Sequence, residues 1–168
     1  MAEEHIYWGL VEDNSLIVIP VGHITAVLCP ELKAKVQSFL RPEARIKALY
    51  FDFSACGYMD STFMGLLVCL AKALRDAGLA RPVVYKANAQ CMSLFRTMGM
   101  VKLLKFSDAS CPRPLLIEEI LSLEQTSAGF LLNAHKELSA LSDENIERFS
   151  ALISALEKEL YLPPDTEG

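Results

Sequence analysis

Residues 16–21 (LIVIPV) form an uninterrupted apolar run rich in β-branched side chains, and this run limits the possible folds more than any other segment. A strand with one solvated face alternates apolar and polar residues, whereas a continuous run indicates a strand that is buried on both faces. Pro20 lacks a backbone N–H group, which predicts that this end of the strand lies at a sheet edge or a strand terminus.

Strands and helices alternate along the first three quarters of the chain. The pattern predicts strands at residues 6–11, 16–21, 46–53, 83–87 and 103–106, and helices from about residue 29 to 40 and at 60–77, 89–98 and 114–124. This alternation predicts an α/β fold with a mixed, largely parallel sheet of four to five strands flanked by helices. The first two strands are too close in sequence for a crossover, so we expect them to pair antiparallel.

The β pattern stops after residue 125, and two amphipathic helices follow. Thr126 and Ser127 can cap the first helix, and Ser142–Asp143 can cap the second. The second helix carries an apolar seam at intervals of three and four residues: Ile146, Phe149, Ile153, Leu156 and Leu160. Two heptads are marginal as an isolated coiled coil, so the helices form an αα-hairpin that packs back on the chain, or a homodimer seam, or a groove for a partner helix. We therefore divide the chain into residues 1–124 and a helical hairpin with a frayed polar tail at 125–168.

Composition excludes several classes of protein. Of the 168 residues, 52% are hydrophobic and 22% charged, which excludes an intrinsically disordered chain. The formal net charge of −5 argues against nucleic-acid binding, which normally requires excess Lys and Arg. No apolar run reaches the roughly 18 residues needed to cross a bilayer, and the N-terminus (MAEEHIYW) lacks a secretory pattern. We expect a cytoplasmic protein that does not insert into membranes.

Sequence motifs of catalysis and metal binding are missing. The five cysteines include no CxxC pair, the three histidines are scattered, and there is no HExxH motif, Walker loop or GxGxxG motif. No nucleophile has a base close to it in the sequence. We therefore expect a non-enzymatic protein with reduced thiols and with no metal or cofactor.

Residues 46–68 (IKALYFDFSACGYMDSTFMGLLV) lead from a strand ending in Asp52 to a helix that opens at Asp60–Ser61. The segment DSTFMG at residues 60–65 resembles the signature Asp-Ser-Ser/Thr-Gly-Leu-Gly of the STAS domain family, named for sulfate transporters and anti-sigma factor antagonists. Residues 22–32 (GHITAVLCPEL) resemble the glycine-led loop of that family, and residues 94–104 (LFRTMGMVKLL) resemble its third helix and last strand. The resemblance covers roughly residues 6–124 and implies a STAS-like sheet, to which the C-terminal hairpin is an addition.

The resemblance also implies a function. In that family a partner kinase phosphorylates the serine that directly follows the Asp, which is Ser61 here. It implies a module that binds an anti-sigma factor with serine-kinase activity while Ser61 bears no phosphate, with a metal-dependent PP2C-type phosphatase restoring binding. The partner-binding residues that it implies are Thr25, Tyr58, Asp60, Ser61, Thr62, Phe63 and Met64.

Ser61 can also be interpreted from its place in the chain alone. Its hydroxyl can cap the helix, and a serine at a loop tip should be accessible. A phosphate there should leave the fold intact, because attraction to the helix dipole and repulsion from Asp60 are of comparable size.

Two positions depart from the family pattern. Phe63 stands where the family has glycine, and Thr25 stands where many members have Asp. The Phe63 ring could hinder a typical kinase, or it could form an apolar docking patch with Tyr58 and Met59. The alternative function is a STAS scaffold or adaptor subunit of a sensory or lipid-transport complex that is not phosphorylated. The first half of the helix from residue 61 is apolar nearly all round, so its outer face is covered by the hairpin or exposed for binding.

Overall fold

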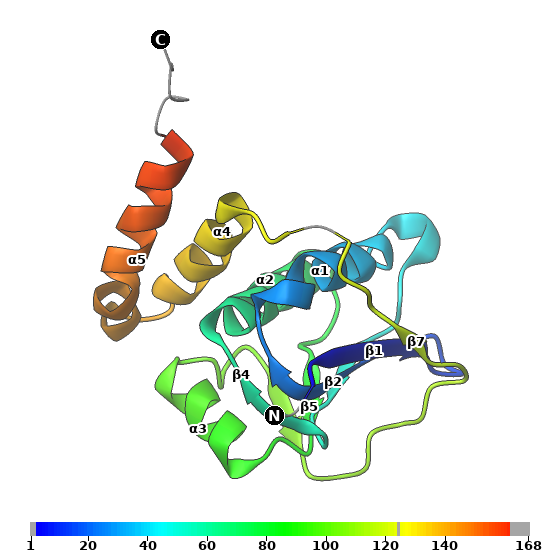
Figure 1. The fold of residues 1–168 in the computed structure, drawn as a ribbon. Helices are drawn as coiled ribbons and strands as arrows, with labels where there is room; N and C mark the ends of the chain where they lie inside the picture. Colours follow the sequence, from blue (N-terminus) through cyan, green and yellow to red (C-terminus); the bar gives the residue numbers. More distant parts are fainter. Residues whose placement is uncertain (1–2, 124, 162–168) are drawn as a thin grey trace.

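Seven strands form the sheet in the part of the chain that the computed structural model describes, residues 3–123 and 125–161 (Figure 1). They are β1 (His5–Leu10), β2 (Leu16–Ile24), β3 (Leu49–Asp52), β4 (Cys56–Met59), β5 (Val83–Tyr85), β6 (Lys105–Ser107) and β7 (Glu118–Glu119). The strand order is β6-β5-β3-β2-β1-β7, and β4 pairs with β2 off this path. The β1–β2 and β1–β7 pairs are antiparallel and the others are parallel, which confirms the mixed, largely parallel sheet.

Five α-helices accompany the sheet in the described part of the chain. They are α1 (Cys29–Ser38), α2 (Ser61–Asp76), α3 (Ala89–Thr97), α4 (Ala128–Ser139) and α5 (Asp143–Tyr161), with short 3-10 turns at Ala26–Leu28 and Pro42–Ala44. In Figure 1, α4 lies between α2 and α5, in agreement with the α2–α4 and α4–α5 contacts. None of the helices within residues 3–123 and 125–161 combines the length and apolar character needed to cross a membrane.

Strand β2 is the central element, as the apolar run predicts. Leu16, Ile17 and Val18 are fully buried. Pro20 lies inside this strand and not at an edge, so that expectation is wrong. The parallel partner β3 pairs with β2 only as far as Val18, and β4 begins to pair at Gly22. Pro20 therefore falls in the gap between two partners, where its missing N–H group costs no ladder bond on that side.

Two segments differ from the sequence prediction. The segment predicted as a loop after residue 53 contains β4, a short strand that pairs with the end of β2. The prediction of a closing helix at residues 114–124 is wrong over the described residues 114–123, where β7 pairs with β1. Main-chain bonds from Leu115 N to Leu10 O (2.9 Å) and from Ile120 N to Ile6 O (2.8 Å) hold this segment extended.

Gly9 permits the close approach of the 114–118 segment to β1. A side chain at Gly9 would overlap Pro114 and the carbonyl group of Leu116. The apolar spacing of this segment resembles that of a helix, but the edge of β1 offers its backbone a set of hydrogen-bond partners. Pairing with the sheet therefore outweighs the helical pattern.

The C-terminal hairpin, defined here as α4, α5 and their connection, packs back on the chain. The predicted caps are confirmed: Phe130 N donates to Ser127 Oγ and Asn145 N donates to Ser142 Oγ, both at 3.1 Å. Within the predicted seam Phe149 and Leu156 are buried and Ile153 is half-buried, whereas Ile146 and Leu160 are exposed. The seam is thus used mainly inside the molecule, and a homodimer through its exposed members stays a prediction. The predicted frayed tail and the proposed boundary after residue 124 fall on positions outside the described residues.

Asn145 fastens this hairpin to the rest of the chain. Its fully buried amide donates from Nδ2 to Met98 O (2.9 Å) and Leu138 O (2.8 Å), and its Oδ1 accepts from Arg148 Nη1 (2.7 Å). One side chain therefore ties the start of α5 to the end of α4 and to the residue after α3.

Asn145→Ala should lower the free energy of unfolding by about 2 kcal/mol, because two carbonyl groups lose a buried donor. For a chain of this size the loss corresponds to a fall of about 4–8 °C in Tm. Thermal unfolding followed by circular dichroism measures it. The control is Ser154→Ala at an exposed position of α5, and equal effects of the two substitutions would contradict the role given to Asn145.

Candidate functional site

The candidate site lies where β2 and β4 end and α2 begins. Asp60 N donates to Ile24 O (2.9 Å), which fixes the start of α2 against the end of β2. The Asp60 carboxylate accepts from Phe63 N through Oδ1 (2.9 Å) and from Ala26 N through Oδ2 (3.1 Å). Asp60 is therefore the N-cap of α2, and the prediction that the Ser61 hydroxyl caps this helix is wrong.

Thr25 belongs to the same corner. Glu4, ahead of β1, accepts two hydrogen bonds from it, one from Thr25 N (2.9 Å) and one from Thr25 Oγ1 (2.7 Å). The structure thus brings together three of the predicted site residues, Thr25, Asp60 and Ser61. Glu4 was not predicted, since only the pairing of β1 with β2 brings it to this corner.

Burial raises the pKa of the Asp60 carboxyl above its ordinary value, because the charged form loses hydration. The hydrogen bonds from Phe63 N and Ala26 N favour the carboxylate and offset part of this effect, while the negative charge of Glu4 adds to it. The corner is consequently acidic and partly desolvated at the positive end of the α2 dipole.

Ser61 is the first residue of α2, and its hydroxyl contacts the C-terminal hairpin. Ser61 Oγ lies 2.8 Å from Nε2 of His135 on α4, and Nδ1 of the same ring lies 2.7 Å from Leu131 O. A carbonyl oxygen only accepts, so Nδ1 carries a proton, and a neutral imidazole protonated at Nδ1 accepts at Nε2 from the Ser61 hydroxyl. His135 is only 3% exposed and Ser61 is half-buried.

The Ser61 hydroxyl is therefore not free at a loop tip, contrary to the sequence prediction. A phosphate on this oxygen would replace the hydroxyl hydrogen of its contact with His135. The expectation that a phosphate leaves the fold intact stays a prediction, and the contact with His135 is the one that the modification would change.

The predicted apolar docking patch is not on the surface. Phe63 and Met59 are fully buried, and the Phe63 ring packs at 6.3 Å from the Phe53 ring in the core. Thr62 and Met64, which were predicted to bind a partner, are also buried. Tyr58 is half-buried with its ring edge-on to His23 at 4.6 Å. Phe63 thus substitutes for the family glycine by filling the core and does not form a contact surface.

His135 is the main site residue that sequence reasoning missed. A histidine with no acid or cysteine at metal-ligand spacing gave no signal of a site. The one usable hint was its place between Leu131 and Leu138, at spacings of four and three residues on the apolar stripe of its helix. That position predicts burial, and a buried imidazole needs hydrogen-bond partners.

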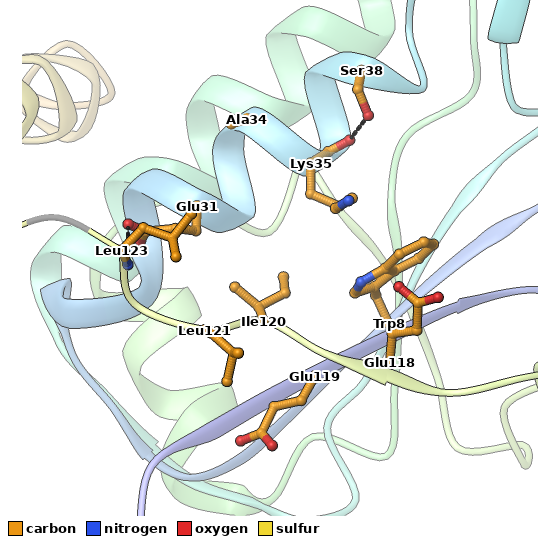
Figure 2. Close-up of a pocket in the computed structure, with 10 residues that line it drawn as sticks. All are labelled: Trp8, Glu31, Ala34, Lys35, Ser38, Glu118, Glu119, Ile120, Leu121 and Leu123. Atoms are coloured by element: carbon orange, nitrogen blue, oxygen red, sulfur yellow. Dashed lines mark hydrogen bonds between the residues drawn. The ribbon is translucent and has the colours of Figure 1, made fainter.

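A separate groove of about 430 Å³ lies between α1, β1 and the segment that contains β7 (Figure 2). Lys35 Nζ lies 4.7 Å from the centre of the Trp8 ring, and Leu123 N donates to Glu31 Oε1 (3.0 Å) at the other end. Its lining residues come from α1, β1 and the stretch 118–123, and thus from neither α2 nor the C-terminal hairpin. Within residues 3–123 and 125–161, no group of three His, Cys, Asp or Glu residues is arranged to hold a metal ion.

Comparison with known proteins identifies the fold. No protein-family model matches the chain, and no curated protein matches it in sequence. The solved structure of the anti-sigma factor antagonist SpoIIAA in its unphosphorylated form matches with a TM-score of 0.53 at 16% identity, over 62% of this chain and 89% of that chain. The chain has the STAS fold.

Two further structures agree with this assignment. The Bacillus cell fate determinant SpoIIAA in its phosphorylated form matches with a TM-score of 0.51 at 15% identity, over 61% of this chain and 90% of that chain. A Thermotoga maritima protein assigned to the anti-sigma factor antagonists matches with a TM-score of 0.53 at 17% identity, over 61% of this chain and 85% of that chain. These STAS structures are matched over nearly their whole length, whereas more than a third of the present chain lies outside each match.

Asp60→Ala should destabilise the STAS fold more at low pH than at neutral pH. Loss of the cap costs about 1–2 kcal/mol. Because the pKa of Asp60 is higher in the folded than in the unfolded chain, its contribution is complete below the unfolded pKa and falls as pH rises through the folded pKa.

Urea unfolding of the wild-type protein and of Asp60→Ala, at about pH 3.5 and at about pH 7, measures the loss of unfolding free energy at each pH. Asp76→Ala, at the exposed end of α2, is the matched control. A destabilisation by Asp60→Ala that grows with pH would contradict the assignment.

Proposed function

We propose that this chain is a non-enzymatic binding module of the anti-sigma factor antagonist type, which docks an anti-sigma factor with serine-kinase activity and is switched by phosphorylation of Ser61. The observation that carries the proposal is the place of Ser61 in a STAS fold. It is the first residue of α2, directly after Asp60, which caps the helix and also accepts from Ala26 N. The solved STAS neighbour SpoIIAA exists in an unphosphorylated and a phosphorylated form.

The physical basis of the switch is a change of charge at an acidic corner. A phosphate carries about −1.5 to −2 charges, and it would stand beside Asp60 and near Glu4. Added negative charge and bulk at this position would oppose a partner that docks on the unmodified corner. Removal of the phosphate by a metal-dependent PP2C-type phosphatase would restore binding.

A second function is favoured by one observation, the engagement of the Ser61 hydroxyl by the buried His135. In a STAS scaffold or adaptor that is never phosphorylated, the Ser61–His135 contact would never have to open. The Phe63 side chain, buried where the family has glycine, is compatible with either function.

Phosphate mapping and partner capture in the source organism test the proposal. The tagged chain is purified from its native cells, and its intact mass and phosphopeptides are measured. We expect the mass of one phosphate on Ser61 in a fraction of the wild-type protein and none in Ser61→Ala. We also expect capture of a serine kinase of the anti-sigma class.

Ser61→Asp and Ser61→Asn form the matched pair, since the two side chains have similar size and differ in charge. The proposal predicts kinase affinity at least about tenfold weaker for Asp than for Asn. Absence of phosphate on Ser61 together with equal binding by both variants would overturn the switch and favour the scaffold.

A further inference from the structure

The outer face of α2 is occupied by the chain itself. A Cβ atom added at Gly65 would overlap the main chain of Ala134, so α4 lies directly on the α2 backbone at this point. Gly65 follows Ser61 by four residues and therefore lies on the same face of the helix, one turn further on. The residue after Ala134 is His135, whose ring reaches Ser61.

The contact continues along the same stripe of α2. Asn133 Nδ2 lies 3.5 Å from the thiol sulfur of Cys69, and Lys72 forms an ion pair with Glu137. The α2 partners at positions 61, 65, 69 and 72 are spaced by four, four and three residues, which is one helical face. All four of their partners come from a single stretch of α4, residues 133–137.

The base of the C-terminal hairpin is anchored at the same corner. Thr126 Oγ1 donates to Ala26 O (2.8 Å), and Ala26 N donates to the Asp60 carboxylate (3.1 Å). The segment that leads into α4 thus starts beside the cap of α2. A hairpin fixed there can leave α2 and return as a unit if the hydrogen bond from Asn145 Nδ2 to Met98 O (2.9 Å) also opens.

We propose that the C-terminal hairpin is an intramolecular cover for the Ser61 face of α2, and that a protein which modifies or binds Ser61 must first displace it. The inference rests on the proposed function, which makes Ser61 the switch residue. A phosphate on Ser61 opposes the closed cover, because it replaces the hydroxyl hydrogen of the Ser61–His135 contact and adds bulk beside the buried ring. By thermodynamic reciprocity, phosphorylation opens the cover by the same factor by which the cover opposes phosphorylation.

Reactivity of a thiol at position 61 tests the cover without any kinase. Ser61→Cys is introduced into the full chain, and the rate of N-ethylmaleimide addition to the introduced thiol is measured by peptide mass spectrometry. The second substitution Gly65→Ala keeps α2 intact, because alanine is the better helix former, and it pushes α4 away from the helix. We expect the introduced thiol to react about tenfold faster in this background, since labelling follows the open population.

Gly129→Ala is the matched control, because it makes the same change in α4 at a position where an added Cβ meets only an ordinary contact. The labelling rate at position 61 should then equal that of Ser61→Cys alone. The native Cys111, half-exposed and remote from the hairpin in sequence, provides an internal reference rate in every sample.

A charge reversal gives a second route that does not depend on the Gly65 variant. Lys72→Glu places a carboxylate against Glu137 and should also speed labelling at position 61. The double variant Lys72→Glu/Glu137→Lys restores an ion pair and should slow it again. Equal labelling rates in all backgrounds would overturn the cover. The proposed function would be unaffected by that result, because the phosphate mapping tests it separately. Conversely, faster labelling with no phosphate ever found on Ser61 would support the cover and overturn the switch.

Discussion

The close approach of two backbones at Gly65 and Ala134 determines how this molecule is assembled. A side chain of any size at residue 65 would hold α4 off α2. With glycine there, His135 comes within hydrogen-bond distance of Ser61, and Lys72 meets Glu137. The apolar stripe of α2 opposite the sheet is then covered inside the molecule. The STAS fold and its added hairpin consequently form a continuous packed unit at the site where the family resemblance places the regulatory serine.

Much of the architecture could be predicted from the sequence, because its signals were local. Three signals depend only on residues close together in the sequence: the apolar run in β2, the serine caps of α4 and α5, and the spacing of apolar residues in α2. The structure agrees with all three. The closing helix could not be excluded in this way. Residues 114–123 have a plausible helical pattern, and only the free edge of β1, more than a hundred residues earlier in the chain, holds the segment extended. Strand β4 was missed for the same reason, since its four residues become a strand only beside β2.

The site was predicted in part. Spacing alone placed Asp60 and Ser61 at the start of α2, and the family resemblance added Thr25, which the structure brings to the same corner. The role of each group depended on partners from distant segments. Asp60 also binds Ala26 as it caps the helix, and Ser61 is engaged because α4 returns to cover it. The side chains of Phe63 and Met59 were assigned to a surface, but they point into the core, since a helix that starts directly after a strand must turn one face toward the sheet.

The contact between α2 and α4 is the central claim, and a zero-length cross-link tests it most directly. A water-soluble carbodiimide joins Lys72 to Glu137 only if α4 lies on α2, and it joins Lys136 to Glu157 (3.3 Å) as long as α4 and α5 stay paired. On dilute monomeric protein we expect both cross-linked peptides, with loss of the first alone in Glu137→Gln. Recovery of the Lys136–Glu157 product without the Lys72–Glu137 product would show a hairpin that is folded but detached from α2, and would contradict this account.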